Sequence, residues 1–66
     1  MNIHVNGERR SIDTPVTVAQ LLALLGVAER RVAVEVNREI VPRSQHARRE
    51  LCDADRVEVV IAIGGG

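Results

Sequence analysis

Hydrophobic and polar residues alternate at the start of the chain, which is the spacing of a β-strand with one buried face. The apolar positions in this stretch are Met1, Ile3 and Val5. Asn6-Gly7 follows them, and these two residue types tolerate the positive φ angles of a two-residue hairpin turn. Residues 8–12 then return along the first strand, so the pattern predicts a β-hairpin over residues 1–12.

The stretch TVAQLLALLG, residues 17–26, has helical spacing and a signal at each end. Thr17 and Gln20 have the spacing of a capping box, and Gly26 suits the left-handed position that follows a helix. Its apolar residues recur three and four positions apart and share one face: Val18, Leu21, Leu22 and Leu25. The segment therefore predicts an amphipathic helix.

Alternation resumes after the helix and predicts a strand over residues 32–36. Residues 37–39 predict a turn into the short apolar piece Ile40-Val41, which Pro42 ends. Residues 43–49 are polar and have room for a helical turn.

The last part of the chain begins with Leu51, which is expected to anchor a loop in the core. The segment Asp53-Ala54-Asp55 predicts a turn into the final strand. One face of that strand consists of Val57, Val59, Ile61 and Ile63, and the other of Glu58, Val60 and Ala62. The order of elements predicts an α+β domain in which one helix covers one face of a mixed, four- to five-stranded sheet.

Composition narrows the possible functions. The chain has 66 residues, no aromatic residue, and nine basic against nine acidic residues. It therefore offers neither stacking platforms nor a basic surface for nucleic acid or an anionic membrane. All nine basic residues are arginine. A single cysteine excludes an internal disulfide, and the opening MNIHVNG lacks the features of a signal peptide, which predicts a cytoplasmic protein.

Individual side chains give weak indications of chemistry. Cys52, a lone cysteine, is expected to be a small core residue. His4 and His46 lack the spacing of metal ligands, so we predict no metal site. A turn explains the acidic residues Asp53, Asp55 and Glu58 without a bound cation. The arginine pairs could meet acidic partner surfaces, but solvated surface positions are the favoured interpretation for residues 9–10, 30–31 and 48–49.

Four sequence features combine with the order of strands and helix: the opening hairpin, VNREIVPR at residues 36–43, DAD at residues 53–55, and the run Gly64, Gly65 and Gly66. Together they resemble the ThiS family, the sulfur carriers of bacterial thiamine biosynthesis. The resemblance covers the whole chain and implies a ubiquitin-like β-grasp domain over residues 1–63 with a flexible glycine tail over residues 64–66. Relatives commonly have glycine where this chain has Ala54, a difference that affects the turn more than the function.

The resemblance implies that the carboxylate of Gly66 is the reacting group. A carboxylate is a poor electrophile, so a ThiF-like adenylating enzyme would activate it with ATP. Sulfur from a cysteine desulfurase relay would then convert it to a thiocarboxylate, and a ThiG-like thiazole synthase would receive the sulfur. On this interpretation the chain is a protein co-substrate rather than an enzyme and binds no cofactor. Gly64 and Gly65 would keep the arm thin, and Val60 and Ala62 would contribute to a docking patch for the adenylating enzyme.

Other interpretations stay open from the sequence. A related carrier would donate sulfur to molybdopterin or another product. A ubiquitin-like modifier would be joined through Gly66 to lysines of other proteins, although the lack of internal lysine argues against chains built on itself. The tail could also be inert, as the end of a passive interaction domain or as an engineered linker. Val60 and Ala62 could equally be scattered exposed aliphatic residues.

Overall fold

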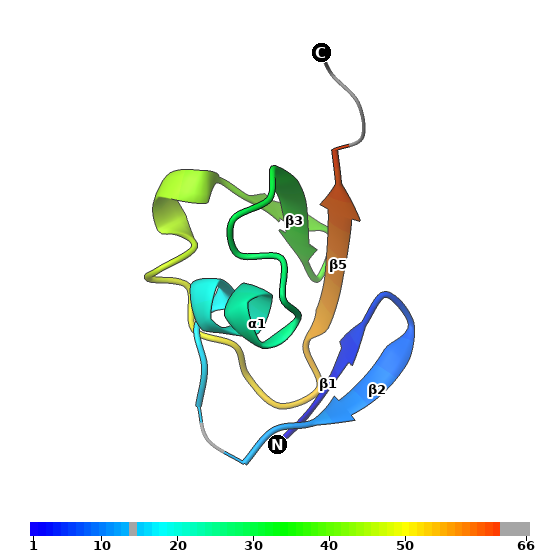
Figure 1. Cartoon of the computed structure of the whole chain (residues 1–66). Helices are drawn as coiled ribbons and strands as arrows, with labels where there is room; N and C mark the ends of the chain where they lie inside the picture. Colours follow the sequence, from blue (N-terminus) through cyan, green and yellow to red (C-terminus); the bar gives the residue numbers. More distant parts are fainter. Residues whose placement is uncertain (14, 63–66) are drawn as a thin grey trace.

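Five strands form one mixed sheet, and the helix α1 covers one face of it (Figure 1). The computed structural model describes residues 1–13 and 15–62. Its elements are β1 (Asn2–Val5), β2 (Glu8–Ser11), α1 (Val18–Leu24), β3 (Val32–Val36), β4 (Glu39–Val41), the 3₁₀ helix η1 (Arg43–Gln45) and β5 (Arg56–Ile61). The strand order is β2-β1-β5-β3-β4, in which β1 and β5 are parallel and the other neighbours antiparallel. This is the ubiquitin-like β-grasp arrangement, and it places β5 in the middle of the sheet.

The first hairpin turn has the positive φ angles that Asn6-Gly7 indicated, and the second turn has the same backbone. Asn6 and Gly7 have φ angles of 51° and 83°, and Asn37 and Arg38 have φ angles of 52° and 70°. Positive φ at both central residues is the type I′ turn, whose twist matches that of the strands it joins. The second turn is one residue shorter than predicted, because Glu39 already pairs within β4.

The ends of α1 confirm the predicted caps. The Gln20 N–H donates to Thr17 Oγ1 (3.2 Å), and the Thr17 N–H donates to Gln20 Oε1 (2.8 Å). Gly26 follows the helix with a φ of 76°. The first two amides of α1 donate to the carbonyl groups of Arg49 and His46, at 2.9 and 2.8 Å. The segment after η1 therefore satisfies the start of the helix with backbone oxygens, which costs less than leaving those amides unpaired.

The core between α1 and the sheet is entirely aliphatic. Its buried members are Ile3, Val5, Val16, Val18, Leu21, Leu22, Val34, Val36, Val41, Leu51 and Val57. They include the predicted face of the helix except Leu25, which is partly buried, and the predicted anchor Leu51. Within the described residues, no helix has the length and apolar character needed to cross a membrane.

Cys52 and His46 have environments that the sequence did not indicate. The prediction that Cys52 is a core residue is wrong, because the side chain is exposed. Leu51 fills the inward position next to it, and the Cys52 N–H begins the acidic turn by donating to Asp55 Oδ2 (2.8 Å). His46, expected in a loop, is only 8% exposed, and its Nε2 lies 3.0 Å from the carbonyl oxygen of Val41.

Candidate functional site

The strand that leads to the glycine run is held in the sheet up to its last described residues. Ile61 pairs with Val32 of β3, and the Ala62 N–H donates to the carbonyl oxygen of Arg31 at 2.9 Å. Ile63 and residues 64–66, with the predicted reacting group, lie outside the described residues. The sheet thus defines where any tail beyond Ala62 begins.

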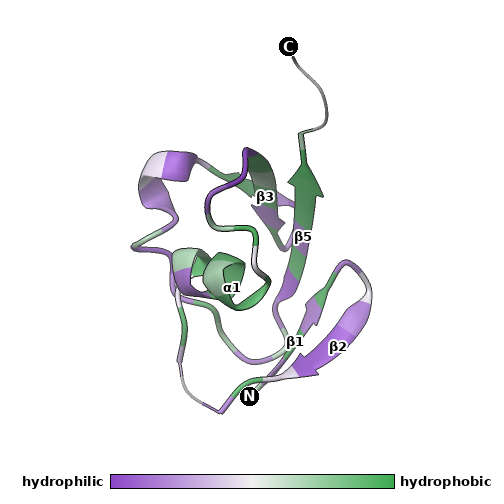
Figure 2. Ribbon diagram, in the orientation of Figure 1, coloured by the Kyte–Doolittle hydropathy of each residue, from purple (hydrophilic) through white to green (hydrophobic). Residues whose placement is uncertain are grey.

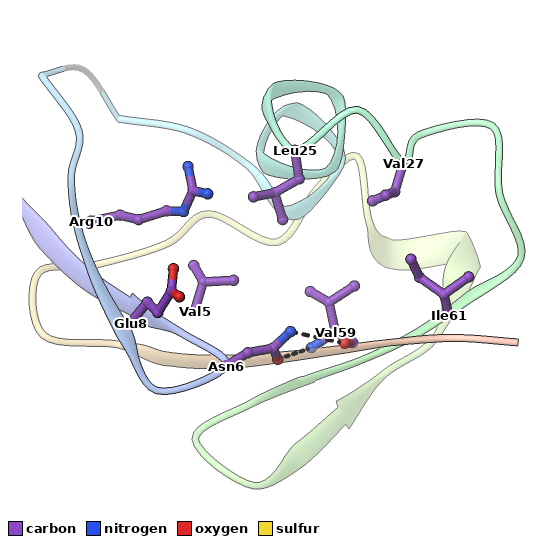
Figure 3. A pocket seen from close by; sticks show the side chains of 8 residues that line it. All are labelled: Val5, Asn6, Glu8, Arg10, Leu25, Val27, Val59 and Ile61. Carbon is purple, nitrogen blue, oxygen red and sulfur yellow. Dashed lines mark hydrogen bonds between the residues drawn. The ribbon is translucent and has the colours of Figure 1, made fainter.

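Asn6 attaches the first hairpin to β5 through its side chain (Figure 3). The Val59 N–H donates to Asn6 Oδ1 at 2.8 Å, and Asn6 Nδ2 donates to the Val59 carbonyl oxygen at 3.1 Å. β1 itself pairs with β5 only through His4 and Val5. The Asn6 backbone N–H still donates to the Val57 carbonyl oxygen at 2.9 Å, and the side-chain amide extends this contact two residues further along β5.

Asn37 makes the corresponding attachment near the start of β5. Its Oδ1 accepts from the Arg56 N–H at 3.0 Å, and its Nδ2 donates to Asp55 Oδ1 at 2.9 Å. Both asparagines occupy left-handed turn positions, which asparagine adopts at lower cost than most residues. The sequence marked both as turn residues, but their contacts with β5 depend on the tertiary arrangement.

The face of β5 opposite α1 carries the predicted docking residues. Val60 is 63% exposed, and Ala62 is exposed as well. The register places Ala33 of β3 directly opposite Val60, and both residues are exposed on that face. Ile40 of β4 is 76% exposed and pairs with Glu35 of β3. On its other side, Glu35 pairs with Glu58 of β5. We refer to Ala33, Ile40, Val60 and Ala62 as the open-face patch.

Sequence reasoning missed Ala33 and Ile40 as members of the open-face patch. Alternation already placed Ala33 on the side of its strand opposite Val34 and Val36. The sequence did not reveal that β3 pairs with both β4 and β5, which brings Ala33 and Ile40 onto the same face as Val60. Strand register depends on contacts between distant segments.

A hollow of about 270 Å³ lies on the other side of β5, between that strand, the first hairpin and the end of α1 (Figure 3). Its aliphatic lining comes from Val5, Leu25, Val27, Val59 and Ile61, and its polar lining from Asn6, Glu8 and Arg10. The lining includes no hydroxyl, thiol or imidazole group, and its ionisable side chains are Glu8 and Arg10.

The acidic turn before β5 uses its carboxylates to hold the backbone. Asp53 Oδ1 accepts from the Asn2 N–H at 2.7 Å, and Asp55 accepts from Cys52 and Asn37. Ala54 in this turn has a φ of 72°, in the left-handed region. Among the residues that the structure describes, no group of three or more His, Cys, Asp or Glu side chains is arranged to hold a metal ion.

Comparison with known proteins gives the chain a family. The sequence model of the ThiS family matches residues 3–66. The chain belongs to the ThiS family. A crystal structure of the thiamine biosynthesis protein ThiS from Geobacter metallireducens superposes with a TM-score of 0.83 at 37% identity, covering 100% of both chains. That similarity confirms the β-grasp fold.

Two further relatives differ in how much of their own length this chain covers. The sulfur carrier protein ThiS of Bacillus subtilis (strain 168) is 40% identical over 50 residues, 76% of each chain. A thiazole synthase of Paramagnetospirillum magneticum (strain ATCC 700264 / AMB-1) is 48% identical over 66 residues, which is 100% of this chain but 20% of that protein. The chain thus spans about a fifth of the length of the thiazole synthases that it matches.

Proposed function

We propose that this ThiS-family chain is a sulfur carrier for the thiazole ring of thiamine and that the carboxylate of Gly66 is the group that reacts. The proposal is supported by one observation: in this ThiS-family sequence, hydrogen bonds to β3 and to Arg31 hold the chain in the sheet up to Ala62, directly before Ile63 and the glycine run. A carrier needs its reactive end at a fixed place on a stable domain, and a strand that starts between β1 and β3 and stays bonded to the β3 side up to Ala62 provides one.

The proposed chemistry begins with activation of the Gly66 carboxylate. The carboxylate attacks the α-phosphorus of ATP on an adenylating partner, pyrophosphate leaves, and an acyl adenylate results. A persulfide from a desulfurase relay then attacks the carbonyl carbon and displaces AMP. A thiol cleaves the resulting acyl disulfide at the donor's sulfur, forms a disulfide with the donor, and leaves a thiocarboxylate on Gly66.

Each part of the chain has a defined task in this proposal. Gly64 to Gly66 span at most about 10 Å and lack side chains, which suits a narrow channel in a partner. The open-face patch docks on the adenylating enzyme, which binds the ATP. The carrier is a co-substrate without a catalytic side chain, and because its first reaction consumes ATP, the proposal places it in the cytoplasm.

Thiazole synthase is the proposed acceptor of the sulfur. The support is that segments similar to the whole of this chain belong to the same polypeptides as two thiazole synthases, at 48% and 42% identity. Domains that act on one another are often found within one chain, so we propose that this chain presents its tail to a thiazole synthase.

ATP–pyrophosphate exchange tests the first step. The chain is mixed with the ThiF-like enzyme of its own organism, ATP and labelled pyrophosphate, and a variant lacking Gly66 serves as the control. We expect exchange that depends on the chain and is lost in the variant. Equal exchange with both proteins would show that Gly66 is not the adenylated residue.

A further inference from the structure

Three arginines gather at the end of the molecule where β5 leaves the sheet. Arg30 and Arg31 lead into β3, Arg43 begins η1, and all three side chains are exposed. They line one small hollow of about 70 Å³ whose other lining residues are Leu22, Ala28, Val32 and His46. In Figure 1 the start of β3, η1 and the arrowhead of β5 all lie toward the upper end of the molecule, and Figure 2 shows both arginine-bearing segments as strongly hydrophilic.

The backbone ties this cluster to the tail. The Arg31 carbonyl oxygen accepts from the Ala62 N–H at 2.9 Å, so one arginine lies beside the residue that directly follows β5. The four residues that follow Ala62 span at most about 14 Å when fully extended. A protein that takes Gly66 into its active site must therefore bring its surface close to these arginines.

The residues that line the hollow include no carboxylate that could balance the positive charge of the three arginines. Glu29 is the acidic residue next to it in sequence, and it is exposed outside that lining. Asp53 and Asp55 lie in the turn that begins β5, where they bind backbone amides. Although the whole chain has a net charge of zero, the exit of β5 is therefore locally basic.

We propose that Arg30, Arg31 and Arg43 form a docking surface for a carboxylate-rich surface around the adenylation site of the partner enzyme. The inference rests on the proposed function and adds the chemical character of the partner's surface around its adenylation site. Guanidinium groups at the edge of an interface act mainly by accelerating and orienting the encounter, and they form bidentate contacts with carboxylates. Ala62 of the open-face patch, whose N–H donates to the Arg31 carbonyl oxygen, would supply an adjoining apolar contact.

The test is the steady-state kinetics of ATP–pyrophosphate exchange with the ThiF-like enzyme of the same organism. The variant is Arg30→Glu/Arg31→Glu, and the matched control is Arg9→Glu/Arg10→Glu, which makes the same charge change on β2. We expect the first variant to raise the KM for the carrier at least about tenfold at low salt, with kcat unchanged. The control should stay within about twofold of the unaltered chain, a difference of about 0.4 kcal/mol.

Salt and a third variant sharpen the result. The difference in KM should shrink at about 0.5 M NaCl, where the Debye length is about 4 Å. Arg43→Gln should raise KM in the same direction, and circular dichroism should show the same thermal transition for all variants. A lower kcat with an unchanged KM would overturn the docking surface and indicate contact with the ATP phosphates instead. Equal KM values for the two arginine pairs would refute the inference alone, whereas no exchange with the unaltered chain would refute the proposed function.

Discussion

Replacing Asn6 by glycine tests whether a turn side chain holds β5 in place. Glycine adopts the φ of 51° without strain, so the substitution removes the two bonds to Val59 and leaves the turn conformation available. Each bond contributes about 0.5–1.5 kcal/mol net, and glycine adds a few tenths through the unfolded chain. We expect the free energy of unfolding to fall by about 2 kcal/mol, which corresponds to about 8–16 °C in Tm for a domain of this size.

Urea denaturation measures the loss, and amide hydrogen exchange locates it. The Val59 amide should exchange faster in Asn6→Gly, while the Arg56 amide keeps its relative protection. Asn37→Gly is the matched control, because Asn37 occupies an equivalent turn position and binds Arg56 instead. The reasoning is refuted if Asn6→Gly unfolds within about 0.5 kcal/mol of the unaltered chain, or if both substitutions accelerate the same amides.

Two further substitutions test the acidic turn and the open-face patch. Ala54→Gly should raise the free energy of unfolding by about 0.5–1 kcal/mol in urea denaturation. Glycine adopts the φ of 72° without strain, although the greater entropy of the unfolded glycine chain offsets part of this stabilisation. A loss of stability would contradict this expectation. Val60→Asp should lower Tm by about 4–8 °C, because the side chain is exposed but strands disfavour aspartate by about 1 kcal/mol, and it should raise the carrier's KM in pyrophosphate exchange about tenfold. An unchanged KM would remove Val60 from the docking patch.

Local patterns were sufficient to predict most of the elements. The helix was identifiable because its capping box, its apolar face and its terminal glycine all lie within residues 17–26. The two faces of β5 followed from alternation alone, and Val57 is buried while Val60 is exposed, as predicted. Information of this kind is complete within one segment, so no knowledge of the rest of the fold was needed.

Contacts between distant segments were beyond sequence reasoning. Asn6 and Val59 are 53 positions apart, and nothing near either residue indicates their pairing. The same holds for Arg43 and Arg31, which share a hollow only because η1 packs beside the start of β3. Cys52 was placed wrongly because a general preference of free cysteine for the interior was applied where Leu51 already fills the inward position.

The intact mass of the protein after incubation with ATP, cysteine and a lysate of its host tests the carrier chemistry most directly, alongside a variant lacking Gly66. We expect a mass increase equal to the exchange of one oxygen for one sulfur, confined to the C-terminal peptide and absent from the variant. An unchanged mass, with or without heavier conjugates to other proteins, would contradict it; conjugates would point to a protein modifier, and their absence in a competent lysate to an inert tail.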